Sequence, residues 1–295
     1  MTSRSMRTVV GIDWSGAAVA QERPSLKIWV AVVQAGILLR LFPTSRNGAR
    51  EALQEMASET SDLIIGFDFA FGYPAWYARE HLLVNSAREL WRLARADRAL
   101  LAATPGDPRR SIPVGSWPFW RAGTPRPTGN PEIWRECDRH LRAQHDVHSL
   151  SSVFQFVGAS QVGPATLAGM ATLADLADDG FAIWPFDAPA TGQPLVAEVW
   201  PRLAARDVVK SDPAARLRWV DSALHKPNAA AGSVIPNPDH RALILASDDA
   251  FDAVAAALWL DSLPAVANHS VWPRLAELPA AAQLEGWVLG VDRPA

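Results

Sequence analysis

The sequence contains a single cysteine, Cys137, among 295 residues. An internal disulfide needs two cysteines, so we expect the hydrophobic core to hold the fold, in a reducing compartment such as the cytoplasm. No apolar run approaches the roughly 20 residues that a membrane-spanning helix requires. Residues 1–7 are too few and too polar to form a signal peptide. These absences predict a cytoplasmic protein with no membrane partner.

The chain also lacks an excess of positive charge, since its formal net charge is −3. This balance argues against binding nucleic acid through a uniformly basic surface, although a local basic groove is still compatible with it. Tyrosine is scarce, with two residues against 13 tryptophans. Two of these, Trp14 and Trp200, lie beside acidic residues discussed below, where each either packs in the core or offers a ring for stacking.

Short apolar runs rich in β-branched residues alternate with one amphipathic helix in the first quarter of the chain, which predicts an α/β domain. The expected strands are residues 8–13, 26–33, 36–42 and 62–71, and the expected helix is 47–58. Helices are then expected at 76–101, 131–144 and 164–180, around an irregular segment rich in proline and glycine at 104–131. The last part predicts strands at 195–200 and 285–291, helices at 213–224 and from 247, and a loose stretch at 226–239.

This order of elements predicts a chain of three parts. A core would begin with residues 1–74 and resume with residues 185–295, and residues 75–184 would form a mostly helical insertion. The length is sufficient for one large domain or for a core that carries such a subdomain.

Acidic residues recur inside apolar sequence, where a charge is costly unless a cation meets it. Asp13 ends the first strand, Asp68 lies between two phenylalanines, and Glu198 lies in the run LVAEVW. Asp249 and Asp252 are three residues apart and so share one face of the last long helix. Three of them have an ordinary structural alternative: a turn for Asp13, an ion pair with Arg202 for Glu198, and helix capping for Asp249.

Taken together, these acids predict a metal site centred on Asp13. The alanines at 253 and 255–257 would let the last helix lie close to the sheet and bring Asp252 towards Asp13. Several carboxylates at one place stay ionised only around a cation. Ligation by oxygen alone selects Mg²⁺ or Mn²⁺ over Zn²⁺.

The segments GIDWSG, IGFDFAFGYP, EVWPRL and DDAFDAVAAA resemble those of the bacterial domain-of-unknown-function family 429. That family is a predicted nuclease of the RNase H-like superfamily, and the pattern is closest to the Holliday-junction resolvase branch. The resemblance implies an α/β fold with an RNase H-like core, a mixed sheet flanked by helices. It also implies metal ligands at Asp13, Asp68 and Asp252, with Asp249 and Glu198 as further ligands or supporting residues.

The reaction that this resemblance implies is hydrolysis of a phosphodiester bond by a carboxylate-bound two-metal mechanism. In such sites the ions lie roughly 3.5–4 Å apart, one generating the nucleophilic hydroxide and the other stabilising the leaving oxygen. No serine or cysteine nucleophile is then needed, and the chain contains no G-x-S-x-G segment.

Several basic and aromatic residues are candidates for contact with a nucleic acid or nucleotide substrate. Arginines interleaved with aromatics suit binding of single-stranded or distorted nucleic acid. The same pattern also fits a surface loop that folds onto the insertion. The candidate residues are Trp14, Ser15, Arg202, Lys210, Arg109, Arg110, Trp117 and Arg121.

Other functions are weighed against the nuclease. A nucleotide-binding phosphotransferase of the actin and sugar-kinase type would use residues 11–16 as a phosphate turn, but it normally duplicates the core and carries a second glycine-rich turn. A non-catalytic binding module would keep the fold and lose the acids. Cys137, His140, His145 and His148 lie close in sequence but match no standard zinc spacing, and residues 158–163 lack the ending of a P-loop. DNA, RNA or a small nucleotide as substrate, endo- or exonuclease action and the oligomeric state all stay open.

Overall fold

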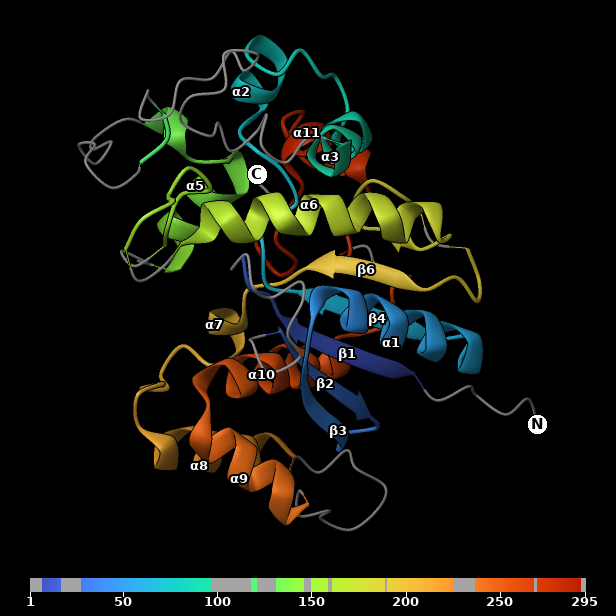
Figure 1. Cartoon of the computed structure of the whole chain (residues 1–295), viewed down its shortest axis with the longest axis vertical. Coiled ribbons are helices and arrows are strands. Elements are labelled where there is room, and N and C mark those ends of the chain that lie inside the picture. Colours follow the sequence, from blue (N-terminus) through green and yellow to red (C-terminus); the bar gives the residue numbers. More distant parts are fainter. Residues whose placement is uncertain are drawn as a thin grey trace.

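Figure 1 shows the fold in a computed structural model of the chain, with the sheet between two groups of helices. The structure describes residues 7–16, 28–96, 118–120, 131–145, 150–158, 161–188, 190–224, 237–267 and 270–292. Within these ranges, no helix has both the length and the apolar character needed to cross a membrane.

Six strands form one mixed sheet in the order β3-β2-β1-β4-β6-β5. β1 pairs antiparallel with β2 and parallel with β4, and β6 runs parallel to both β4 and β5. The strands are β1 Thr8–Asp13, β2 Ile28–Gln34, β3 Ile37–Thr44, β4 Leu63–Phe67, β5 Ala182–Ile183 and β6 Leu195–Glu198. The predicted α/β class is therefore confirmed, and a mixed sheet flanked by helices is consistent with an RNase H-like core.

The two faces of the central strands are buried against different helices, which explains why these strands are apolar on both sides. Val10 and Ile65 belong to a core shared with Leu53 of α1 (Arg46–Glu59) and Met170 of α6 (Val162–Asp178). On the opposite face, α10 (Asp248–Ser262) lies against β1 and β2. β1 is thus the centre of a three-layer arrangement.

The other helices within the described residues are shorter than α1, α6 and α10. They are α2 Ala75–Glu80, α3 Ala87–Ala96, the 3-10 helix η3 Pro131–Ile133, α5 Glu136–His145, α7 Pro201–Ala204, α8 Pro213–Leu224, α9 Pro238–Ala246, the 3-10 helix η4 Leu275–Glu277 and α11 Ala282–Glu285. α6 packs against both α3 and α1, so the segment 75–184 shares the core of the sheet. The division of the chain into a core and an insertion remains a prediction.

The helix expected at 76–101 is interrupted in its described part. Leu83 has a φ of 56°, in the left-handed region, and α3 begins only at Ala87. The Ser86 hydroxyl accepts from the Glu89 N–H at 3.2 Å, and the Glu89 carboxylate accepts from the Asn85 N–H at 2.8 Å. This S-x-x-E pattern is a helix-start signal that the periodicity of the leucines obscured.

Four other expectations need correction. The strand expected at 62–71 ends at Phe67, and the helix expected at 131–144 is a 3-10 turn followed by α5. The strand expected at 285–291 is absent, because Gly286 and Gly290 have φ values of 76° and 83° and leave a single bridge between Glu198 and Val288. Of the loose stretch expected at 226–239, residues 226–236 lie outside the described residues, and the last two belong to α9, which the Asn237 side chain caps by accepting from the Asp239 N–H.

α10 approaches β1 as closely as two backbones can. A Cβ atom added to Gly11 would overlap the Ala253 carbonyl oxygen and the Ala257 backbone nitrogen. The alanines of α10 were expected to let this helix lie close to the sheet, and Ala253, Ala256 and Ala257 do contact β1 at Gly11. This contact sets the distance between α10 and β1.

We expect Gly11→Ala to lower the free energy of unfolding by about 3 kcal/mol, because the added methyl group must push two backbones apart. Gly36→Ala is the matched control: Gly36 has no atom within 4 Å of the added Cβ but has a φ of 77°. Its cost should be about 1 kcal/mol, from conformation alone. Urea denaturation measures both, and an equal cost for the two variants would contradict the close packing.

Candidate metal centre

The ends of two neighbouring parallel strands place the first two acids side by side. Ile12 of β1 pairs with Phe67 of β4, and the Asp68 N–H donates to the Ile12 carbonyl at 3.1 Å. Asp13 directly follows Ile12, and Asp68 directly follows Phe67, so both acids lie at the carboxyl ends of the two neighbouring strands. The carboxyl ends of parallel strands are the usual location of ligand sites in α/β sheets.

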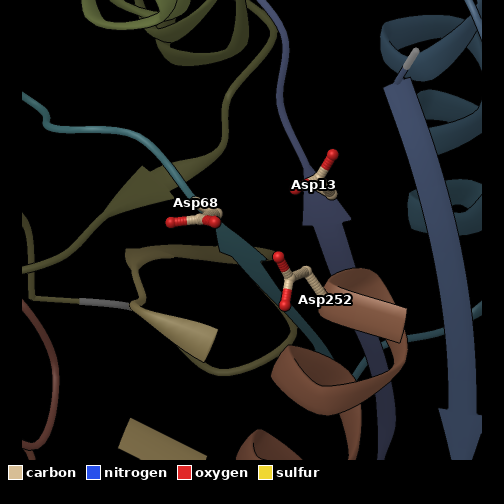
Figure 2. A group of neighbouring side chains, drawn as sticks. All are labelled: Asp13, Asp68 and Asp252. Carbon is tan, nitrogen blue, oxygen red and sulfur yellow. The ribbon is translucent and has the colours of Figure 1, made fainter. Parts of the chain in front are cut away.

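The third acid comes from α10. Ser247 caps this helix by accepting from the Ala250 N–H at 3.1 Å, which leaves Asp252 in the second turn. The Gly11 contact holds that turn against β1. Figure 2 shows Asp13, Asp68 and Asp252 gathered at the ends of β1 and β4 and beside α10.

The three carboxylates are close enough to share one ion. Each offers an oxygen, and these oxygens lie within 4.8 Å of one another. Ligands on opposite sides of a Mg²⁺ ion are about 4.2 Å apart, so a small adjustment of side chains would close the site. Three carboxylate oxygens are the donor set that hard cations such as Mg²⁺ and Mn²⁺ prefer. The residues therefore fit the predicted metal, although the identity of the ion remains a prediction.

The acids lie in the wall of a cavity of about 690 Å³. Within the described residues, the wall also includes Lys210 and the start of α6. The Ser15 carbonyl is held by the buried Arg46, whose Nη2 and Nε atoms donate at 2.9 and 3.2 Å. This contact ties the turn after Asp13 to the first residue of α1.

The carboxyl groups destabilise one another when ionised. Burial, followed by the charges of Asp68, Asp252 and Asp249, raises the pKa of Asp13 well above its ordinary value. Burial and the charge of Asp252 raise the pKa of Asp68 to about 8, and burial also raises the pKa of Asp252. Lys210 opposes all three shifts. A divalent cation would oppose both causes, because it stabilises the ionised carboxylates in a buried site and offsets their mutual repulsion.

Lys210 forms an ion pair with Asp252, through its Nζ atom and the Oδ2 atom of the carboxylate. Asp13 and Asp68 have no lysine or arginine at ion-pair distance among the described residues. Lys210 was predicted to contact substrate. The structure shows that it lines the cavity of the three aspartates and contacts Asp252 directly.

Glu198 is held differently from the three aspartates. Arg135 donates to its two oxygens at 2.6 and 2.8 Å, and the Phe71 N–H donates to it at 3.0 Å. The arginine that pairs with it is therefore Arg135 of the 131–145 segment, not Arg202, which donates to the Val208 carbonyl at 3.1 Å. Glu198 lines the cavity, but its oxygens are already bound.

Asp249, Trp14 and Ser15 were also predicted as site residues, and all three line the cavity. They differ in burial. Asp249 is half-buried and lies outside the group of three. Trp14 is buried, with its ring 5.4 Å from that of Phe67, so most of its surface belongs to the core. Ser15 is half-buried beside it. The metal-ligand role of Asp249 remains a prediction, and so do the substrate contacts of Trp14, Ser15 and Arg202.

Four predicted substrate-binding residues lie outside the described residues: Arg109, Arg110, Trp117 and Arg121. His148 of the alternative zinc group also lies outside them. The other members of that group are dispersed, since Cys137 is buried beside Asp138, His140 faces Trp287, and His145 meets Arg206 at 2.9 Å.

Sequence reasoning missed Arg135 and its second partner, Asp138. The Arg135 Nη2 atom donates to Asp138 at 2.9 Å, both side chains are buried, and both line the cavity. The spacing of three residues at a helix start was visible, but it is common on exposed helices. Nothing in the sequence showed that this pair would be buried against β6.

The raised pKa of Asp68 predicts how the metal-free protein responds to pH. A carboxyl that binds its proton more tightly in the folded state makes stability fall as pH rises from its unfolded pKa, near 4, to its folded pKa, about 8. We expect Asp68→Asn to flatten this decline and to melt several degrees above the wild type at pH 8 in EDTA. Thermal melts at a series of pH values test this, and an unchanged slope would contradict it.

The contacts of Glu198 predict that it supports the fold and does not bind the ion. Glu198→Gln should cost about 3 kcal/mol of unfolding free energy, because it weakens the pairing of a buried arginine. Its affinity for Mn²⁺, measured by calorimetry, should stay within about twofold of the wild type, a factor worth less than 1 kcal/mol. Loss of Mn²⁺ binding in a folded Glu198→Gln protein would make Glu198 a ligand instead.

Comparison with known proteins gives one match. The family described as "Protein of unknown function (DUF429)" matches residues 11–260, a span that contains Asp13, Asp68 and Asp252. No curated protein matches the chain, and no solved structure matches it. Because the match covers most of the sequence, the chain belongs to the DUF429 family.

Proposed function

We propose that this protein is a metal-dependent nuclease that hydrolyses phosphodiester bonds. The observation that carries the proposal is the convergence of Asp13, Asp68 and Asp252 from β1, the end of β4 and α10 into one cavity. Two of these acids have no cationic partner among the described residues, so the group carries an excess of negative charge when ionised. A divalent cation is the ligand that relieves it.

The chain's own residues would divide the work as follows. The three aspartates hold the ion, which when bound supplies Lewis-acid stabilisation of phosphate charge and activates water. Lys210 and Arg202 line the same cavity and would donate to phosphate oxygens. Trp14 and Ser15 form the wall beside Asp13 and would position the substrate.

The cavity is large enough for a nucleotide unit of a nucleic acid. Ligand pockets typically measure about 300–1,000 Å³, and this one measures about 690 Å³. Its combination of acids with a lysine and an arginine suits a phosphodiester, whose charge is met partly by the ion and partly by the protein.

A reducing compartment, the cytoplasm, is the proposed location, since the one cysteine, Cys137, is buried as a free thiol.

Incubation with labelled single-stranded, duplex and branched DNA and RNA, with Mg²⁺, Mn²⁺ or EDTA, tests the proposal. We expect cleavage with metal and none with EDTA. Asp13→Asn should reduce the rate at least about 10²-fold, since it removes a charge that acts on the reacting groups.

Asp239→Asn is the matched control, because Asp239 is an exposed acid in the first turn of α9. It should cleave like the wild type. Failure of the wild type to cleave any of these substrates with either metal, or full activity of Asp13→Asn, would refute the nuclease.

A further inference from the structure

We infer that Lys210 is the second cation of this site, and that the three aspartates bind one divalent ion and not two. The inference rests on the proposed function, since it concerns how the same site meets a phosphodiester. It departs from the two-metal arrangement expected from sequence, and it gives Lys210 a role beyond contact with phosphate.

The position of Lys210 is the first reason. Its ammonium contacts the Asp252 carboxylate inside the cavity that Asp13 and Asp68 also line. The Asp252 side chain is 9% exposed and that of Lys210 is 26% exposed, so the pair is partly shielded from water but open to the cavity. The charge of one of the three carboxylates is therefore already met by an ammonium of the protein itself.

The loop that carries Lys210 is fixed in place, which is the second reason. The buried Arg216 of α8 donates to the Lys210 carbonyl, to the Ile244 carbonyl at 2.9 Å and to the Leu245 carbonyl at 2.6 Å. Ile244 and Leu245 belong to the last turn of α9, directly before α10. One guanidinium thus sets the position of Lys210 relative to the helix that carries Asp252.

The supply of ligands is the third reason. A second ion would need further carboxylates, and the two other buried acids in the cavity wall, Glu198 and Asp138, are both bound by Arg135. Asp249 lies outside the group of three. Among the described residues, the site therefore provides one close group of three carboxylates and one ammonium.

A lysine can take the electrostatic part of a second ion. Its ammonium is a compact point charge with three donors, so it can bind Asp252 and a phosphoryl oxygen at the same time. It needs no carboxylates beyond the one it contacts. The site would then present two positive charges to a phosphodiester, one from an exchangeable divalent ion and one from the Lys210 side chain.

Calorimetric titration with MnCl₂ alone tests the inference. We expect one Mn²⁺ per wild-type chain. Lys210→Met should bind Mn²⁺ at least about tenfold more tightly, because an ammonium no longer repels the ion at close range. Lys210→Arg should keep both the stoichiometry and the affinity close to those of the wild type.

The matched control is Arg218→Met, which removes a positive charge from an exposed pair with Asp212 on the outer side of α8. Its Mn²⁺ affinity should be unchanged. Melting curves establish that each variant is folded, and Lys210→Gln replaces Lys210→Met if the latter is not.

Two Mn²⁺ ions per wild-type chain, or an unchanged affinity in folded Lys210→Met, would overturn the inference while leaving a metal-dependent nuclease intact. Absence of Mn²⁺ binding by the wild type would remove the metal site, and with it both proposals. The two failures are therefore distinguishable in one titration.

Discussion

The close contact between Gly11 and the alanines of α10 is the constraint on which the site depends. Backbone meets backbone there, so the distance from β1 to the helix is set by van der Waals contact and not by flexible side chains. Asp13 lies two residues along the strand and Asp252 begins the turn above it. A larger residue at either surface would lift one carboxylate away from the other, and the three carboxylate oxygens would no longer lie within 4.8 Å of one another.

Much of this could be predicted from sequence, because the relevant signals are local. Apolar runs identified β1 and β4, although the end of β4 at Phe67 was missed, and the alanines of α10 predicted its approach to the sheet. Lys210 and Glu198 were recognised as residues of the site, but their partners were not. Partner choice depends on which segments meet in space, and no pattern within residues 131–145 indicates that Arg135 will reach β6.

Arg135 illustrates how a buried charge can define an arrangement. It binds Glu198, Asp138 and the Glu285 carbonyl, and so joins the 131–145 segment to β6 and to the C-terminal part of the chain. Burying these charges contributes little to stability, whereas leaving any one of them unpaired is costly. The network therefore favours one relative placement of three segments, and it forms the wall of the cavity next to the acids.

The pairing of β1 with α10 joins residues from opposite ends of the sequence. Contacts of such wide separation carry the entropic cost of closing a long loop, which slows folding. Until α10 packs on the sheet, the apolar strands β1 and β4 have only the face towards α1 to bury. During synthesis, a chain that has not yet emerged beyond residue 262 exposes the face of its central strands that α10 covers in the folded protein.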